Sequence, residues 1–434
     1  MSLLKLHHPL NLSQMRNFRN DIHMACLAAL MTFLCGPLRS QSLDSLLGLL
    51  EVRNPELAMY ATQSGIADQE ILAAGQLPAT EFGLGMFALP VETRLGPQWI
   101  RLSAGQAFPW PGTLAARQEA AKRMTPLIPL QARIKARELS LQLTEAWLDW
   151  YRLGQEAIIR TEQIELMESL ESKLLAAVTS GQEGMEQVLE LRMEIDKLNL
   201  EATLAETRRK ASRAIINALL QRPPDEPLTL RDTLRFLSLP AQTDTTLFFQ
   251  AASYPGFELL RAKTAASEAR TDMLELQGKP SFSVGLDYIL VGRRTDAEPA
   301  GNGRDILGPR LGIKWPVSQK QTDAFRQQEH LRRDNIRLEG TALEQTLFRE
   351  TAKALALWEE ASLSYNFVSD QLKLLESVRS ILEARYSSGN SDFERLIKNY
   401  TKEMDIDLIL LNAIVNSHRA NARMRLWLGS TAEQ

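Results

Sequence analysis

The chain has 434 residues, a length that allows two or three ordinary domains, and a formal net charge of −3. Only 6% of the residues are aromatic, and the long middle stretches are rich in alanine, leucine, glutamate, glutamine and arginine, which is typical of long helices packed through narrow seams. No basic patch interleaved with aromatic residues occurs, so the sequence does not point to nucleic acid as a partner.

Residues 1–42 are predicted to be a signal peptide and not part of the fold. Arg16 and Arg19 precede an apolar run over 24–36, and small residues lead up to a cleavage point after Ser42. The run is too short to span a bilayer as a helix. The alternative interpretation is a short buried helix.

The same segment contains a second possible start site and both cysteines of the chain. Met15 is a candidate for the true start of the chain, because the charged part of the signal follows it directly. Both cysteines, Cys26 and Cys35, lie in the segment, and Cys35 is a candidate lipidation site. Against lipidation, Phe33 and Leu34 stand where a lipoprotein signal has small residues. After cleavage the chain would hold no cysteine and could form no disulfide.

The remainder of the chain repeats one pattern twice. Residues 253–270 are similar to residues 53–70, and each copy then reaches alternating segments, a Trp-Pro pair and a long helical hairpin. The predicted units are repeat 1 over 43–221, a link over 222–250, repeat 2 over 251–429 and a tail over 430–434.

Repeat 1 begins with a helix and two strands. Asn54-Pro55-Glu56 supplies a capping side chain, a proline suited to the first turn and an acidic first-turn residue. Alternation of apolar with small or polar residues predicts strands at about 81–89 and 98–106.

A helical hairpin at about 112–221 completes repeat 1. Its first helix is predicted over 118–179, and Pro126 and Pro129 should kink or break it. The return helix is predicted over 183–222, with apolar residues that step by three and four as in a coiled coil.

Repeat 2 has the same order of elements. Strands are predicted at about 281–291 and 309–316, and a helical hairpin at about 318–428. The long helix over 319–387 and its counterpart in repeat 1 have roughly 60–70 residues, on the order of 100 Å, which is too long for a compact globular domain.

Each predicted strand has an apolar face and a face of small, polar or charged residues. Strands of about nine to eleven residues cross a membrane when tilted, whereas the alternative is two hairpins of an ordinary half-buried sheet. Four strands cannot close a barrel and open edges cannot face lipid, so several chains would share one barrel. The residues expected to face lipid are Phe82, Leu84, Ile100, Leu102, Phe282, Val284, Leu286, Tyr288, Leu311, Ile313 and Trp315.

The most distinctive strings of the chain are NPEL (54–57), FPWPGTLAARQEA (108–120), SGQEGMEQVLELRMEID (180–196), GPRLGIKWPV (308–317), SSGNSDFERL (387–396) and RLWLG (425–429). Together they resemble the TolC-like outer-membrane efflux protein family, and within it the heavy-metal (CzcC/CusC-type) branch. The resemblance implies a protomer that is mainly α with a β-barrel part, and a homotrimer. Three copies would form a 12-stranded transmembrane β-barrel, continued across the periplasm by a long α-helical coiled-coil barrel.

The resemblance also implies a role for the turns of the two hairpins. In the family these tips dock a periplasmic adaptor, the membrane fusion protein, which links the channel to an inner-membrane pump of the RND type. In this chain the tips are Ser180-Gly181 and Ser388-Gly389, where glycine permits a tight reversal.

A charged gate is a second implication of the resemblance. Family members often close the tunnel with a carboxylate ring about nine residues after the second tip glycine, but this chain has Lys398 there, with Arg395 nearby. Glu186 and Glu190 lie at a comparable depth in the first hairpin. A closing network of Glu with Arg and Lys is therefore a hypothesis, and solvated charges on a helix face are the alternative.

The sequence contains no catalytic constellation, so we expect no enzymatic activity and no cofactor. His330 and His418 stand alone in the predicted mature chain, the methionines are scattered, and no glycine-rich phosphate loop follows a strand, so no metal site is predicted.

The predicted function is the outer-membrane channel subunit of a tripartite RND-type efflux system. It would be a passive, gated conduit through the bacterial outer membrane, exporting metal cations or drugs. One alternative keeps the channel for type I secretion of a protein or peptide. Another is a periplasmic coiled-coil scaffold, which leaves the four alternating strands unexplained.

Overall fold

The structure is a computed structural model that describes residues 42–181, 184–229, 233–238, 254–388 and 393–428. Most of the predicted signal peptide, with Met15 and Cys35, lies outside these residues, as does Gly389 of the second predicted turn. The elements in chain order are α2 (Leu43–Arg53), α3 (Pro55–Ala74), β1 (Glu81–Thr93), β2 (Gly96–Phe108), α4 (Thr113–Met124), α5 (Leu127–Thr179), α6 (Met185–Leu219), α8 (Pro255–Gln277), β3 (Ser281–Val291), β4 (Ile306–Lys314), α9 (Lys320–Ser387) and α10 (Phe393–Leu428).

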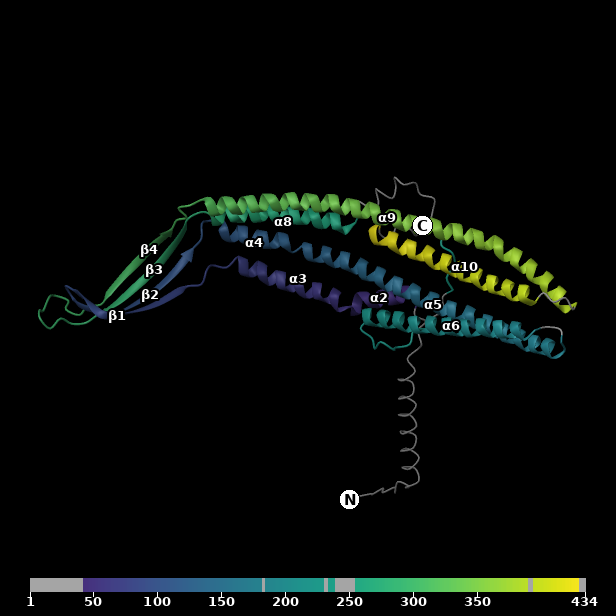
Figure 1. Cartoon of the computed structure of the whole chain (residues 1–434). Helices are drawn as coiled ribbons and strands as arrows, with labels where there is room; N and C mark the ends of the chain where they lie inside the picture. Colours follow the sequence, from purple (N-terminus) through teal and green to yellow (C-terminus); the bar gives the residue numbers. More distant parts are fainter. Residues whose placement is uncertain (1–41, 182–183, 230–232, 239–253, 389–392, 429–434) are drawn as a thin grey trace, which may run out of the picture.

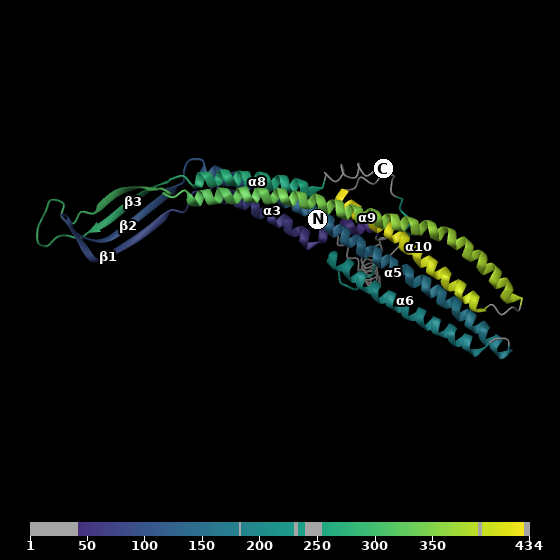
Figure 2. The same ribbon diagram turned by 45° about the horizontal axis from the view of Figure 1, so that its top comes forward.

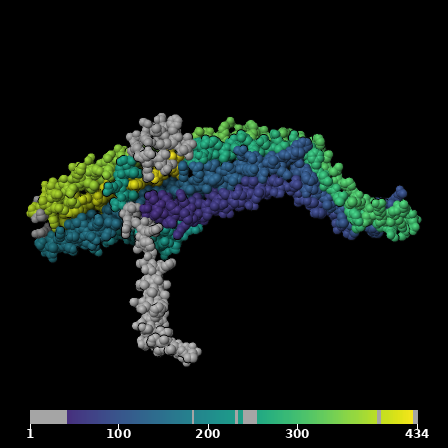
Figure 3. All heavy atoms as spheres, turned by 180° about the vertical axis from the view of Figure 1, so that it is seen from behind, coloured from purple at the N-terminus to yellow at the C-terminus, as the bar shows by residue number. Residues whose placement is uncertain are grey.

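The molecule is elongated, with the sheet at one end and the turns of the two helical hairpins at the other (Figure 1). At the hairpin end α9, α10, α5 and α6 lie side by side in that order (Figure 2), and the contacts run α9 to α10, α10 to α5, and α5 to α6. The space-filling view shows a long, narrow body that bends where the helices meet the strands (Figure 3).

Local sequence signals set the helix boundaries. Asn54 is buried and caps α3, because its Oδ1 accepts from the Glu56 amide at 2.9 Å while its Nδ2 donates to the Leu219 carbonyl at 3.0 Å. The helix predicted over 118–179 divides into α4 and α5 at Pro126. Pro129 lies in the first turn of α5, where a missing amide proton breaks no helical hydrogen bond.

All four strands form one antiparallel sheet in the order β1-β2-β3-β4. The central β2–β3 pair joins the two repeats, with Ala104 opposite Leu286 and Gly105 opposite Gly285. Within the part of the chain that the structure describes, β1 and β4 have no strand on their outer sides.

The strands of repeat 1 are longer than the predicted 81–89 and 98–106. The alternation lapses after Met86, but a register shift between Met86 and Val91 lets the pairing continue to Thr93 opposite Gly96. A loss of strict alternation in the sequence therefore marks a bulge here and not the end of the strand.

β4 lies earlier in the chain than the predicted 309–316. It begins at Ile306, which pairs with Ile289, and ends at Lys314. Pro316 has no amide proton for the ladder, which accounts for the early end. Trp315, expected on the lipid-facing strand, therefore lies just beyond it.

The hairpins are held together by narrow apolar seams, as the spacing of three and four predicts. One cluster unites α5, α6, α9 and α10 near the tips, and another unites α2, α5, α6 and α10 near the middle of the molecule. The buried residues that recur at this spacing are Val188, Leu191, Ile195, Leu198 and Ala205 of α6 and Tyr400, Met404, Leu411 and Val415 of α10.

The described part of the link crosses the hairpins of both repeats. The Leu234 amide donates to Tyr151 Oη at 3.1 Å, and the Leu237 amide donates to Ser417 Oγ at 3.0 Å. The Leu237 carbonyl accepts from Trp358 Nε1 at 3.0 Å. The described part of the link thus ties α5, α9 and α10 together, and its Leu228 and Leu234 pack against the cluster near the middle of the molecule.

Replacing Leu191 by Ala should lower the free energy of unfolding by about 2–5 kcal/mol, because the side chain is 1% exposed and its loss leaves a cavity in the α5–α6 seam. Asp196→Ala, an exposed change on the same helix, is the control and should have a much smaller effect. Denaturant unfolding of both variants in one detergent measures the difference. Equal stabilities would contradict the packing described.

Candidate functional site

One face of the sheet is apolar and uncovered. Phe82 is 81% exposed and Leu311 is 82% exposed, although both side chains are large and apolar. A water-exposed apolar face of this kind marks a contact with lipid or protein. Of the residues expected to face lipid, Ile100 is half-buried and the others are exposed, namely Phe82, Leu84, Leu102, Phe282, Val284, Leu286, Tyr288, Leu311, Ile313 and Trp315.

The opposite face of the sheet is made of glycine, serine and a few charged residues. Arg101 of β2 and Asp287 of β3 form an ion pair across the two repeats, with 2.5 Å between Arg101 Nη2 and Asp287 Oδ2. The Asp287 side chain is only 13% exposed. Arg310 of β4 lies on this same face, in register with Gly285.

The first hairpin tip is a tight, exposed turn. The Ser180 amide donates to the Ala176 carbonyl at 3.2 Å, and the Gly181 amide donates to the Val178 carbonyl at 3.0 Å. Gly181 has φ +74°, a conformation that L side chains rarely adopt. The turn therefore requires the glycine that the sequence places there.

The second tip is anchored from inside. The Ser388 amide donates to the Ala384 carbonyl at 3.2 Å, which ends α9. Phe393, the first residue of α10, is 1% exposed and packs against Tyr386, with 5.6 Å between the ring centroids. The sequence predicts the turn at Ser388, but the packing of Phe393 against Tyr386 was not predicted.

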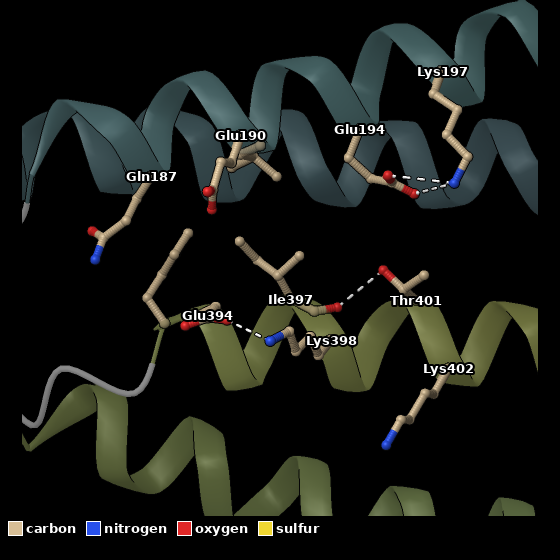
Figure 4. Close-up of a pocket in the computed structure, with 11 residues that line it drawn as sticks. Gln187, Glu190, Glu194, Lys197, Glu394, Ile397, Lys398, Thr401 and Lys402 are labelled. Atoms are coloured by element: carbon tan, nitrogen blue, oxygen red, sulfur yellow. Dashed lines mark hydrogen bonds and ion pairs between the residues drawn. The ribbon is translucent and has the colours of Figure 1, made fainter.

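The four candidate gate residues lie on the tip-proximal turns of α6 and α10. Glu190 points from α6 toward α10 across a cleft of about 410 Å³ (Figure 4). Among the residues that the structure describes, Lys398 forms its ion pair with Glu394 of its own helix and none with Glu186 or Glu190. Arg395 lies one residue after Glu394, near the start of α10. The gate thus stays a prediction that this single chain does not test.

Glu394 is a charged group of the cleft that the sequence did not single out. Its hydrogen bond with Lys398 holds the pKa of the Glu394 carboxyl below its usual value. On the α6 side, Lys197 donates to Glu194 at 3.1 Å, and the same bond raises the pKa of Lys197. Each of these two ion pairs is therefore formed within a single helix.

Two ion pairs fasten the hairpins of the two repeats to each other. Arg419 Nη2 lies 2.7 Å from Asp149 Oδ1, and Arg423 Nε lies 2.8 Å from Glu145 Oε1. Each helix contributes two residues one turn apart, so both pairs form together in this register of α5 against α10. Finding these pairs required the packing of α5 against α10, which no local pattern in the sequence specifies.

Each outer helix of the four-helix layer carries an uncovered apolar stripe. The residues of both stripes recur at steps of three, four or seven, so each set lies on one side of its helix. The stripe of α6 consists of Met185, Leu189, Met193, Leu200 and Leu204, and that of α9 consists of Leu363, Phe367, Leu374, Val378 and Ile381.

None of the helices within the described ranges is both long and apolar enough to cross a membrane. Within the same ranges, no three side chains of the His, Cys, Asp and Glu types lie together as metal ligands would. His330 Nδ1 lies 3.2 Å from Asp334 Oδ2, and a ring nitrogen of His418 lies 2.8 Å from the Arg235 carbonyl.

No protein family model matches the sequence, and no curated protein matches it. Solved structures do match. The MtrE outer-membrane channel of Neisseria gonorrhoeae in its open state is 16% identical, with a TM-score of 0.70 over 89% of each chain. CusC is a protein whose solved structures concern the conformational changes that accompany folding and transmembrane channel formation. It is 15% identical, with a TM-score of 0.72 over 89% of this chain and 92% of its own.

This chain has the fold of these outer-membrane channels. The CmeC outer-membrane channel of Campylobacter jejuni agrees, at 13% identity and a TM-score of 0.69 over 89% of this chain and 85% of its own. The TolC-like fold that the sequence implies for one protomer is confirmed, and the CusC-type structure is among its matches.

Replacing Phe393 by Ala should loosen the second tip, because the side chain fills the space between α9 and α10 beneath the turn. Trypsin should then cut at Arg385 and Arg395 several times faster than in the unchanged protein. Glu394→Gln, which removes only an exposed ion pair, should leave the rates nearly unchanged. Identical cleavage of the Phe393 variant and the unchanged protein would argue against the anchor.

Proposed function

We propose that the protein is the outer-membrane channel subunit of a bacterial tripartite efflux system, with its sheet in the outer membrane and its hairpins in the periplasm. The observation that carries this proposal is the two-faced sheet with open edges, mounted on two very long helical hairpins. An uncovered apolar face suits lipid, and a face of glycine, serine and charge suits a wet lumen.

The open edges of β1 and β4 support a homotrimer. In lipid each unpaired backbone group costs several kcal/mol, so β1 of one copy must pair with β4 of another until the sheet closes. Two copies would give eight strands, whose interior is just filled by side chains, whereas three copies give twelve strands and leave a passage.

The apolar stripes on α6 and α9 support the same assembly. They lie on the two outer helices of the layer, so a neighbouring copy on each side would cover one of them. Their coiled-coil spacing lets α6 of one copy pack against α9 of the next, which would continue the barrel as a helical tunnel.

The hairpin tips are the surfaces that would bind a periplasmic adaptor and, through it, an inner-membrane RND pump. Ser180, Gly181 and Ser388 are exposed at the end of the molecule farthest from the sheet. Transport would be passive diffusion through the tunnel, and adaptor contact at the tips would open it. Glu186, Glu190, Arg395 and Lys398 would form the charged gate when three copies bring the hairpins together.

Two other functions remain as alternatives. A channel for type I secretion of a protein or peptide would use the same fold with a different inner-membrane partner. In a periplasmic coiled-coil scaffold, protein would have to cover the apolar face of the sheet. None of the helices that the structure describes packs on this face. Metal cations and drugs both remain candidate substrates of the efflux channel.

Replacing Leu189 by Glu should break the trimer, because the side chain is 60% exposed in the single chain and would be buried at the α6–α9 contact between copies. Leu189→Met keeps the apolar surface and should keep the trimer. Electrophoresis of unheated, detergent-extracted outer membranes measures the assembly. Trimers of equal stability in both variants would contradict the proposed contact.

The gate makes a separate prediction for conductance in planar bilayers. Glu190→Gln and Lys398→Met should each increase the conductance of the closed channel, because each removes a charge from the network between hairpins. Glu268→Gln, a change on α8 away from the tips, is the control and should not change it. Unchanged conductance in both gate variants would remove the charged gate and leave the channel itself standing.

A further inference from the structure

Arg310 lies across the sheet in a cradle made by two glycines. Gly105, Gly285 and Arg310 lie in one row of paired residues on β2, β3 and β4. A Cβ atom at Gly105 would lie 3.3 Å from Arg310 Nη2, and one at Gly285 would lie 3.2 Å from Arg310 Nε. The guanidinium therefore lies against the glycine backbone, close to the surface of the sheet.

Larger residues at these positions would push the guanidinium away from the strands. At Gly285 a Cβ atom would also lie 2.8 Å from the Ala104 carbonyl oxygen, a distance that real side chains avoid. The two glycines thus fix where the charge lies, and they leave the polar face open beside it.

Arg310 forms no direct ion pair with any residue that the structure describes. Asp287, the nearby carboxylate, is already bound to Arg101 at 2.5 Å. Over the described residues, no carboxylate lies within ion-pair distance of Arg310, whose side chain is exposed. On the regularly paired part of this face, the other charges are Glu81, which lies on β1 in the same row as Arg310, and Lys314 at the helix-proximal end of β4. They are opposite in sign.

We infer that Arg310 from the three copies forms a cationic ring inside the barrel, and that this ring selects anionic solutes. The inference rests on the proposed function as a channel. Between the bulge of β1 and the helices, each copy contributes Arg101, Arg310 and Lys314 to this face against Asp287 and Glu81, which leaves one net positive charge per copy. A lumen with low-dielectric walls concentrates the counter-ion of its lining charge. A guanidinium also binds carboxylate, phosphate and sulfonate groups through paired hydrogen bonds.

A cationic ring would distinguish metal cations from anionic drugs. A free divalent metal cation would be repelled by the ring, whereas an organic acid or other oxyanion would be concentrated at it. The substrate class that the barrel fits is an anionic small molecule.

The test is the reversal potential of single channels in planar bilayers under a KCl gradient. The unchanged protein should pass chloride in preference to potassium. Arg310→Gln should lower the ratio of chloride to potassium permeability by at least about twofold, and Asp287→Asn should raise it. Arg310→Lys keeps the charge and should stay close to the unchanged protein, which controls for loss of folding.

An unchanged permeability ratio in conducting Arg310→Gln channels would overturn the inference and leave the channel function intact. A ratio in Arg310→Lys as low as that in Arg310→Gln would also overturn it, because the charge would then not be the cause. Failure of every form, including the unchanged protein, to make a conducting channel would instead contradict the proposed function on which the inference rests.

Discussion

The backbone groups along the outer sides of β1 and β4 are the constraint on which the rest of the account depends. The sheet has four strands, its apolar face is uncovered, and its two edges lack partners within the described chain. Lipid on the apolar face and open edges are incompatible in one copy, because hydrocarbon cannot satisfy backbone amides and carbonyls. Closure by further copies, as proposed, would satisfy the edges, create the lumen and bring the outer helices of adjacent copies together.

Within one copy, the two repeats are joined at several heights. The β2–β3 ladder and the Arg101–Asp287 pair join them in the sheet. Two Arg–carboxylate pairs join α5 to α10 farther along, and the link binds to helices of both hairpins. Closer to the tips, the α5–α10 contact contains carboxylates. Burial of the Asp407 carboxyl raises its pKa, and the negative charges of Glu403 and Glu162 nearby raise it further. The hairpins are thus bound by opposite charges in the middle of the molecule. Toward the tips they bring the carboxylates of Asp407 and Glu162 close to Glu403, which Arg379 holds in an ion pair of 2.6 Å.

Much of this could be predicted from the sequence, because periodicity is a local property. The alternation in 281–291 predicts β3 with its bounds, and the steps of three and four predict the buried seam of α6. The bulge after Met86 and the early end of β4 were missed, because both depend on which residue pairs across the ladder. The setting of Arg310 depends on Gly105 and Gly285 lying beside it from two other strands, which no spacing in one segment reveals.

Closure of the barrel between copies can be tested with paired cysteines. β1 and β4 of one chain are separated by two strands, on the order of 14 Å, so cysteines in them cannot form a disulfide within that chain. Gly83→Cys combined in turn with Gly308→Cys, Arg310→Cys or Gly312→Cys scans the register, with each single variant as control. In oxidised outer membranes the account predicts a covalent ladder that ends at three copies in at least one pair. No cross-link in any pair, or a ladder that does not stop at three, would contradict it.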